Sequence, residues 1–251
     1  MDSMEKRLKT ALITGALSGL GPAYTEYFAT LGYALIVTGK EKKSIRIFAE
    51  DIEKNHHVSV MGLAVDLSDR KGLTVLQRQI DFVCLDALVN NAADEDWGAD
   101  GWADSSETKR LTALQMNTAV SLTLSVLRRM INRNDGVIIN VSPDGGYRSA
   151  AGTRMQISSK IFIRQFTEGL SAQLTDTGIR VQAVCPGTIG PIIAMMGVRP
   201  DKRIHAKGII TGSEPREIVE TAMRELEQGR ILYSYTSRHS LFSKRSEYFA
   251  G

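Results

Sequence analysis

The chain has 251 residues, 43% of them hydrophobic, which is enough apolar material to bury the core of one large domain or two small ones. Its 31 basic and 28 acidic residues are spread along the sequence and give a formal net charge of +3, so the basic patch of a nucleic-acid-binding protein is not expected. The polar start leads into an apolar run too short for a signal peptide or a membrane span, and the 2 cysteines and 4 histidines lack zinc spacing. We therefore expect a cytoplasmic protein that binds a small-molecule substrate, with no metal, no nucleic acid and no membrane partner.

Short apolar runs alternate with amphipathic stretches along the whole chain, which is typical of strand-helix-strand units on a parallel sheet. We predict an α/β fold: one Rossmann-like, doubly wound parallel sheet of about seven strands with helices on both faces, forming a single domain over residues 1–251. The predicted strands, in chain order, are Thr10 to Thr14, Ala34 to Thr38, Val58 to Val65, Leu85 to Val89, Val137 to Val141, Ile179 to Val184 and Ile231 to Tyr233.

Two long stretches interrupt this alternation, residues 94–106 and residues 186–212. Both begin after the carboxyl ends of predicted strands, which is where open parallel sheets bind their ligands. We predict that these two stretches are loops that form the walls of a substrate pocket.

The first predicted strand is followed by TGALSGLG, Thr14 to Gly21, at the start of a predicted helix. Glycines at this place allow a tight turn, let the backbone approach a pyrophosphate, and direct the positive end of the helix dipole at its charge. A tight strand-helix turn without any ligand is the simpler alternative. The residues predicted to contact a dinucleotide here are Gly15, Ser18, Gly19, Leu20 and Gly21.

Further motifs follow in a fixed order: NNAA from Asn90, then Asn117, then SSK ending at Lys160, then Pro186 with Gly187. Together with the glycine spacing, they resemble the classical short-chain dehydrogenase/reductase family over nearly the whole chain. The resemblance implies that Asn90, Pro186 and Gly187 belong to the cofactor site, that Lys160 binds the nucleotide ribose, and that Asn117 lies in the active site. The stretch SEPREIVETAMRELEQGRILYS is also similar to the tail of a bacterial subgroup that mostly uses NADP.

The end of the second predicted strand bears on the choice of nucleotide. NAD-preferring relatives carry an aspartate in the position of Gly39, which is followed here by Lys40. With Lys42 and Lys43 nearby, Lys40 can pair with a 2′-phosphate, so we predict NADP(H) as the cofactor; a solvated basic helix start is the alternative. Asp66, at the end of the third strand, matches the family residue that contacts the adenine, although an aspartate there could also simply cap the next helix.

The active-site motif departs from the family pattern. In the family, a tyrosine four residues before the lysine gives or takes the substrate proton, and a serine thirteen residues before that tyrosine orients the carbonyl. Counting back from Lys160 places Gln156 in the tyrosine position and Pro143 in the serine position. Ser142 is one residue early and would need a bulge to take the serine's place. We therefore predict an atypical family member that lacks both catalytic hydroxyls.

Without those hydroxyls, three functions stay open. The chain could transfer hydride to a C=N (imine or iminium) or activated C=C bond, which needs no positioned acid; it could be a non-redox cyclase; or it could be a catalytically silent NADP(H)-binding protein. Asp144 directly follows the lost serine position, and Arg110 lies seven residues before Asn117, close to the same face of an α-helix. An Asp144 and Arg110 pair could hold a dipolar substrate and move a proton, the alternatives being a plain turn and a solvated helix residue.

The resemblance also implies self-association. Family members commonly form dimers or tetramers through helix faces like those of residues 107–131 and 153–175. A homodimer or homotetramer is therefore expected.

Overall fold

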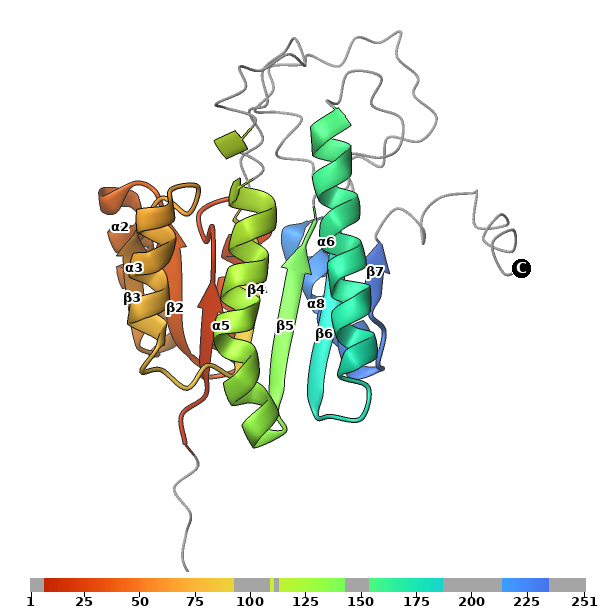
Figure 1. Cartoon of the computed structure of the whole chain (residues 1–251). Coiled ribbons are helices and arrows are strands. Elements are labelled where there is room, and N and C mark those ends of the chain that lie inside the picture. The colour runs from red at the N-terminus through yellow and green to blue at the C-terminus, as the bar shows by residue number, and fades with distance from the viewer. Residues whose placement is uncertain (1–6, 93–108, 111–112, 143–153, 187–213, 235–251) are drawn as a thin grey trace, which may run out of the picture.

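The computed structural model describes residues 7–92, 109–110, 113–142, 154–186 and 214–234. Within these residues, seven parallel strands form one sheet in the order β3-β2-β1-β4-β5-β6-β7 (Figure 1). The predicted sheet is confirmed. Its strands are β1 (Thr10–Ile13), β2 (Ala34–Gly39), β3 (Val60–Ala64), β4 (Ala87–Asn90), β5 (Gly136–Val141), β6 (Ile179–Cys185) and β7 (Leu232–Ser234).

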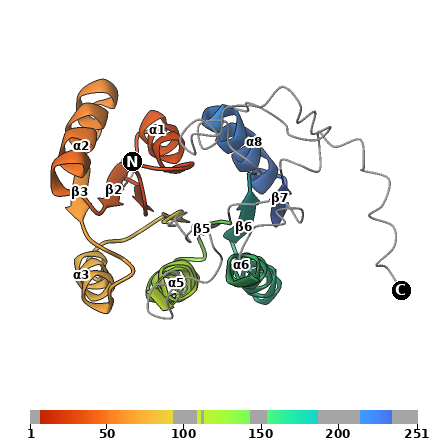
Figure 2. The same cartoon turned by 90° about the horizontal axis from the view of Figure 1, so that it is seen from above.

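Helices cover both faces of the sheet, as predicted (Figure 2). One layer holds α1 (Gly21–Thr30), α2 (Lys42–His56) and α8 (Pro215–Glu227). The other layer holds α3 (Arg70–Ile80), α5 (Thr118–Arg133) and α6 (Arg154–Gln173). A π-helical turn, η1 (Ala113–Asn117), directly precedes α5. In the described part of the chain, no helix has the length and apolar character needed to cross a bilayer.

The central strands have apolar side chains on both faces, which explains their unbroken hydrophobic runs. Leu12 of β1 packs in the core on the α3, α5 and α6 side, whereas its neighbour Ile13 packs in the core on the α1, α2 and α8 side. Ile138 and Ile139 of β5 divide between the two layers in the same way. Each such fully buried side chain contributes about 1.5–3 kcal/mol relative to an exposed one. This two-sided burial fixes the sheet that carries the site.

The direction of winding reverses between β1 and β4. From β1 the chain proceeds to β2 and β3 on one side, and the later strands follow from β4 on the other. Ile13 pairs with Val37 of β2 on one side and with Val89 of β4 on the other, so the carboxyl ends of β1 and β4 lie side by side. Ligands bind at such a reversal point in open α/β sheets. The candidate site is therefore at the upper edge of the sheet in Figure 1.

The sheet edges differ most from the sequence prediction. β3 is shorter than the predicted run from Val58 to Val65, and it is an edge strand with half-exposed or exposed residues such as Met61. Apolar residues next to a strand look the same in the sequence as apolar residues within it. Hydrophobicity alone therefore overestimates the length of an edge strand. The predicted loop 94–106 and all but the first residue of the predicted loop 186–212 lie outside the described residues.

Candidate functional site

The turn between β1 and α1 is built from glycines that no other residue could replace without strain. Gly15 and Gly19 have φ values of +61° and +58°, in the left-handed region. A Cβ on Gly15 would lie 2.8 Å from the Cα of Ala92, and a Cβ on Gly21 would lie 2.2 Å from the carbonyl oxygen of Gly15. The backbone of this turn therefore folds closely on itself and on the loop after β4.

Thr14 and Asn91 hold this turn in place. The Asn91 Nδ2 donates to the carbonyl oxygens of Thr14 (3.3 Å), Gly15 (2.9 Å) and Ser18 (3.2 Å). The Thr14 Oγ1 accepts from the backbone nitrogens of Asn91 and Ala92, both at 3.0 Å, and donates to the Val89 carbonyl. Both side chains are buried. We call this arrangement the Thr14–Asn91 latch, because it ties the loop after β1 to the loop after β4.

The sequence motifs contained both latch residues, but neither was selected as a site residue. The signal was present: TGALSGLG begins with Thr14, and NNAA contains Asn91. Their roles depend on β1 and β4 being neighbours, which only the strand order establishes.

The N-terminus of α1 presents backbone donors that no described residue accepts. In the turn, the nitrogens of Ser18 and Gly21 donate to the carbonyl oxygens of Gly15 and Ser18. Among the described residues, no acceptor is found for the N–H of Gly19 or of Leu20. The helix has no side-chain cap, and the Leu20 side chain is fully buried, so only its main chain can reach a ligand. Free N–H groups at the positive end of a helix dipole form a site for a phosphate-like anion.

The end of β2 combines a close packing contact with exposed charges. A Cβ on Gly39 would lie 2.9 Å from the Leu17 Cδ1, so glycine fits here and a larger residue requires Leu17 to move. Lys40 follows on the exposed surface. Glu41 caps α2 by accepting from the nitrogens of Lys43 (2.9 Å) and Ser44, and these hydrogen bonds, with one from the Ser44 hydroxyl, lower the pKa of Glu41. Residue type alone does not predict this cap, because glutamate is uncommon at that position.

Asp66 lies on an exposed turn after β3, and its Oδ1 accepts from both the nitrogen (2.9 Å) and the hydroxyl (2.6 Å) of Ser68. The N-cap of α3 is Asp69, not Asp66. Partial burial raises the pKa of Asp66, but the Ser68 hydrogen bonds and the charges of Lys40 and Arg110 outweigh it, so its pKa is lowered. The carboxylate is therefore ionised at neutral pH and close to two cations.

Arg110 contacts this same turn. Its Nη1 donates to the Ser68 Oγ at 3.2 Å. The shared face with Asn117 assumed α-helical spacing, yet Ala113–Asn117 is π-helical, and a π turn shifts the face that later residues present. Asn117 is exposed at the end of that turn. Asp144 lies outside the described residues, so the predicted pairing of Asp144 with Arg110 stays a prediction.

Asn90 takes part in a buried polar network beneath the site. Its Nδ2 donates to the Asn140 Oδ1 (2.8 Å) and the Thr123 Oγ1 (3.2 Å), and the Asn140 Nδ2 donates to the Thr167 Oγ1 (2.9 Å). All of these residues are buried. The network joins β4 and β5 to α5 and α6, so this part of the Asn90 side chain supports the framework. A contact between Asn90 and the cofactor stays a prediction.

The residues of the predicted catalytic motif are only partly described. Gln156 and Lys160 lie one turn apart on the continuous helix α6, so no insertion disturbs the count between them. The β5–β6 register runs without a shift to Val141, so no bulge precedes Ser142. Ser142 itself is buried, and its nitrogen donates to the Val184 carbonyl. Pro186 directly follows β6, whereas Pro143 and Gly187 lie outside the described residues.

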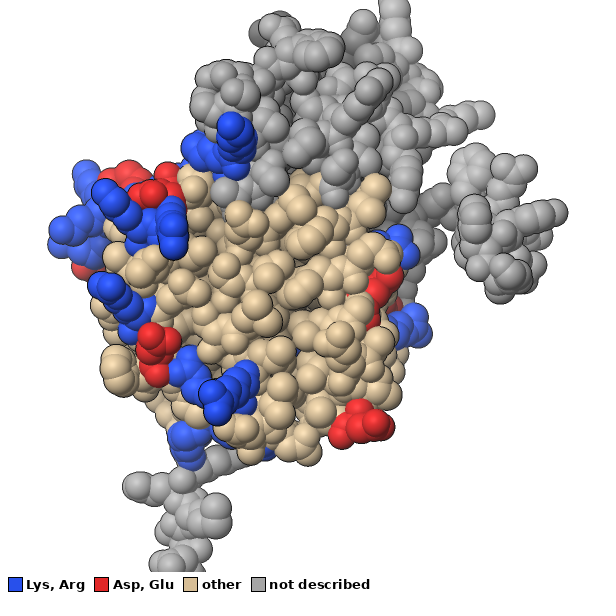
Figure 3. Space-filling view, in the orientation of Figure 1, with Lys and Arg blue, Asp and Glu red and all other residues tan. Residues whose placement is uncertain are grey.

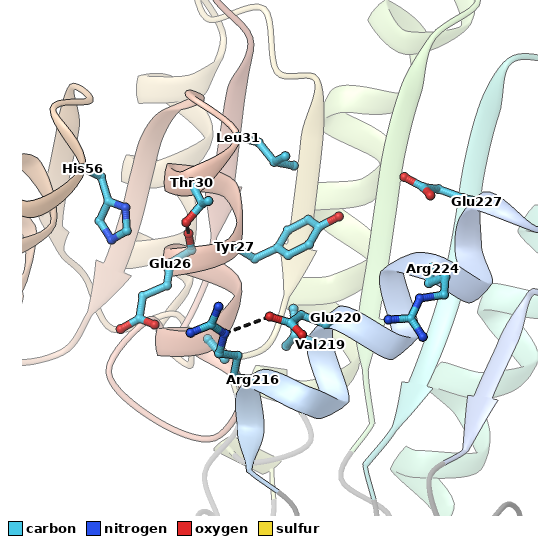
Figure 4. Close-up of a pocket in the computed structure, with 11 residues that line it drawn as sticks. Glu26, Tyr27, Thr30, Leu31, His56, Arg216, Val219, Glu220, Arg224 and Glu227 are labelled. Atoms are coloured by element: carbon cyan, nitrogen blue, oxygen red, sulfur yellow. Dashed lines mark hydrogen bonds and ion pairs between the residues drawn. The ribbon is translucent and has the colours of Figure 1, made fainter.

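A separate cavity of about 450 Å³ lies between α1, the end of α2 and α8 (Figure 4). Both basic and acidic side chains line it, and Arg216 and Glu220 form an ion pair at 2.8 Å. Burial, and then the Glu227 carboxylate, raises the pKa of Tyr27 in its wall. None of the predicted site residues lines it, so it is distinct from the strand-end site. Its walls are formed by Ala23, Glu26, Tyr27, Thr30, Leu31, His56, Arg216, Val219, Glu220, Arg224 and Glu227.

The chain is similar to known dehydrogenases in sequence and in structure. The chain is 30% identical over 212 residues, 82% of this chain and 81% of the relative, to an NADP-dependent 3-hydroxy acid dehydrogenase of Schizosaccharomyces pombe. A short-chain dehydrogenase of Sphingobium yanoikuyae, solved in complex with NADPH, matches with a TM-score of 0.79 and 25% identity, covering 90% of this chain and 87% of that one. A bulky-bulky ketone specific alcohol dehydrogenase of Comamonas testosteroni shares the fold, with a TM-score of 0.79 at 24% identity over 94% of this chain and 89% of that one.

The family model for short chain dehydrogenases matches residues 9–200, which include the glycine-rich turn, the latch and the helix that carries Lys160. A match of this extent agrees with the observed sheet order and with the strand-end site. The chain therefore belongs to the short-chain dehydrogenase family.

Proposed function

We propose that this chain is an NADP(H)-dependent oxidoreductase that reduces a C=N bond or an activated C=C bond in specialised metabolism. The cofactor is supported by the relative from Schizosaccharomyces pombe, which is NADP-dependent, and by the structural neighbour solved with NADPH. The residues present fit such a dinucleotide, since the Gly19 and Leu20 N–H groups at the N-terminus of α1 have no acceptor among the described residues.

The residues after β2 support NADP(H) over NAD(H). Lys40 is exposed beside the site, where an ammonium group can pair with a 2′-phosphate. The neighbouring carboxylate of Glu41 is held by the backbone nitrogens of Lys43 and Ser44 at the start of α2. Because those bonds direct the Glu41 charge to the helix N-terminus, the negative charge next to Lys40 is already compensated.

The chemistry rests on one observation: Gln156 lies one turn before Lys160 on an uninterrupted helix, in the place where the family carries its catalytic tyrosine. A carboxamide is a poor general acid, so a ketone substrate would lack the proton it needs as charge develops on oxygen. NADPH bound here would supply a hydride. An iminium carbon would accept it directly, and a conjugated C=C would give an enolate that takes its proton from water, so neither needs a protein acid. Lys160 holds the ribose in this proposal, and Asn117 lines the pocket beside it.

A replacement acid is proposed at Asp144, which directly follows the position of the lost serine at Pro143. Its carboxyl group could hold a cationic substrate or return a proton to the product. Arg110 is its proposed partner.

Two alternatives share the same nucleotide site. A non-redox cyclase or a silent NADP(H)-binding protein would also tolerate the loss of both hydroxyls at Pro143 and Gln156. All three functions use one domain over residues 1–251, with the loops 94–106 and 186–212 as the walls of the pocket.

The test is a substrate panel with NADPH oxidation as the readout. Cyclic imines and conjugated enones should consume NADPH, while simple ketones should not. If no imine or enone is turned over although NADPH binds tightly, the redox proposal is wrong. Product analysis then separates the alternatives, because a cyclase forms a ring product without consuming the nucleotide, and a binding protein forms none.

We also propose a homodimer or homotetramer. In Figure 3, Lys, Arg, Asp and Glu lie mainly toward the edges of the visible face, and the middle of the face, over α5 and α6, is covered by other residue types. The exposed apolar side chains there include Leu124 (59% exposed), Ile131 and Ile161. An exposed apolar face of this kind is typical of protein-protein interfaces.

A further inference from the structure

We propose that Arg110 is a positioning residue for nucleotide recognition: through Ser68 it orients the Asp66 carboxylate to accept a hydrogen bond from the adenine 6-amino group. This inference rests on the proposed NADP(H) site and extends it to a residue outside the glycine-rich turn.

Two successive hydrogen bonds connect Arg110 to Asp66 through Ser68. The Arg110 Nη1 is 3.2 Å from the Ser68 Oγ, and the Ser68 Oγ is 2.6 Å from the Asp66 Oδ1. A guanidinium group can only donate, so the Ser68 oxygen is the acceptor in the first bond and its proton is free to point at Asp66. Donation from a cation also polarises the hydroxyl and strengthens the bond that it donates.

Only one side of the Asp66 carboxylate is used by these contacts. The Oδ1 accepts both the Ser68 nitrogen and the Ser68 hydroxyl, whereas no hydrogen bond to the Oδ2 is found among the described residues. The side chain is exposed at the carboxyl end of β3, two strands from the glycine-rich turn. The two Ser68 bonds therefore hold the carboxylate by its Oδ1 and leave the Oδ2 as the acceptor for a ligand.

The chemistry of this acceptor selects the adenine over the other groups of the nucleotide. A carboxylate repels phosphates, and it accepts N–H donors. The exocyclic amine of adenine is the donor at that end of NADPH, while the 2′-phosphate is matched by the cation of Lys40 on the neighbouring strand end. Lys40 and Arg110 both lower the pKa of Asp66, which keeps the acceptor ionised.

The turn is also anchored from the opposite side. The Thr118 Oγ1, at the start of α5, donates to the carbonyl of Leu67 at 2.9 Å, and the Leu67 side chain is buried. Thr118 holds the backbone of the turn. The role that we propose for Arg110 is therefore to orient the Ser68 hydroxyl and, through this hydroxyl, the Asp66 carboxylate.

The experiment compares NADPH with its hypoxanthine analogue, in which a carbonyl group replaces the adenine 6-amino group, by fluorescence titration of the full chain. We expect Arg110→Ala to weaken NADPH binding about fivefold and to change binding of the analogue less than about twofold. Arg110→Lys should restore much of the NADPH affinity, since it returns a cationic donor. Arg70→Ala, which removes an exposed cation from the nearby start of α3, is the matched control and should leave the ratio unchanged.

Two outcomes overturn the inference. An equal loss of affinity for both nucleotides shows that Arg110 does not act on the 6-amino group, and an unchanged NADPH affinity in Arg110→Ala shows that Arg110 does not orient Asp66. Failure of the proposed nucleotide site is recognised separately, because in that case the unsubstituted chain binds neither NADPH nor the analogue. Failure of the redox proposal alone appears in the substrate panel and leaves both titrations of the unsubstituted chain unchanged.

Discussion

Lys40 is the single side chain on which the choice of nucleotide most depends. We expect Lys40→Ala to weaken NADPH binding by about 1.5 to 3 kcal/mol, because a charge-assisted contact with the 2′-phosphate is lost. NADH, which lacks that phosphate, should bind as before. Fluorescence titration of both nucleotides measures the difference, and Lys42→Ala serves as a control for the general loss of a cation at the start of α2. A parallel loss for NADH would remove Lys40 from the phosphate site.

Asp66 should titrate abnormally. Its pKa is lowered in the folded chain, so its ionisation stabilises the fold above the ordinary carboxyl pKa, and this contribution is lost as the pH falls through the lowered pKa. Arg110→Ala and Lys40→Ala each remove a cation near the carboxylate and should raise the pKa of Asp66. Carbon-13 NMR titration of the carboxyl group, assigned with Asp66→Asn, measures this shift. An unchanged titration in both variants would contradict the charge arrangement.

Asp144 tests the proposal that a carboxyl group replaces the two catalytic hydroxyls that the sequence is predicted to lack. If Asp144 supplies the acid, Asp144→Asn lowers kcat at least about tenfold while the affinity for NADPH is kept, because a positioned acid acts on the transition state. If it is a plain turn residue, the rate changes little. Steady-state kinetics with an accepted substrate, together with an NADPH titration, give both numbers. A rate equal to that of the unsubstituted chain removes Asp144 from the site.

At the scale of the elements, the turn between β1 and α1 is the most constrained by sterics. In Gly21→Ala the new Cβ would lie 2.2 Å from the Gly15 carbonyl oxygen, so the turn must open and the pyrophosphate donors must move. We expect NADPH affinity to fall more than tenfold in isothermal titration calorimetry. Gly169→Ala is the matched control, since a Cβ on this exposed glycine of α6 meets nothing within 4 Å. Unchanged affinity in Gly21→Ala would show that the turn does not bind the nucleotide.

The strands and helix layers could be predicted from the sequence because each central strand buries both faces and so forms an unbroken apolar run. Contacts between elements that are distant in the sequence could not be predicted in this way. Asn91 bonds to a loop more than seventy residues earlier in the chain, and no local pattern encodes that pairing. Arg110 was assigned by α-helical spacing from Asn117, and this spacing does not anticipate the π-helical turn at Ala113–Asn117. Glu41 was missed because a cap is defined by backbone geometry rather than by residue type alone.

At the scale of the whole molecule, the uncharged middle of the α5 and α6 face should mediate self-association. Leu124→Glu places a charge at its most exposed apolar residue on α5 and should shift the chain toward monomers in light scattering after size-exclusion chromatography. Phe82→Glu is the control, because Phe82 is 96% exposed but lies after α3. Dissociation by both variants, or by neither, would contradict an interface at this face.

The Thr14–Asn91 latch depends on one side chain staying an amide. Deamidation converts asparagine to aspartate with almost no change in shape, but it replaces two N–H donors with a carboxylate. At residue 91 that carboxylate would face the carbonyl oxygens of Thr14, Gly15 and Ser18, which are acceptors without a proton to offer. Its negative charge would also lie against the turn that is proposed to receive a pyrophosphate. Hydrolysis of this one amide would therefore oppose nucleotide binding through charge and lost hydrogen bonds, without changing any residue of the sheet.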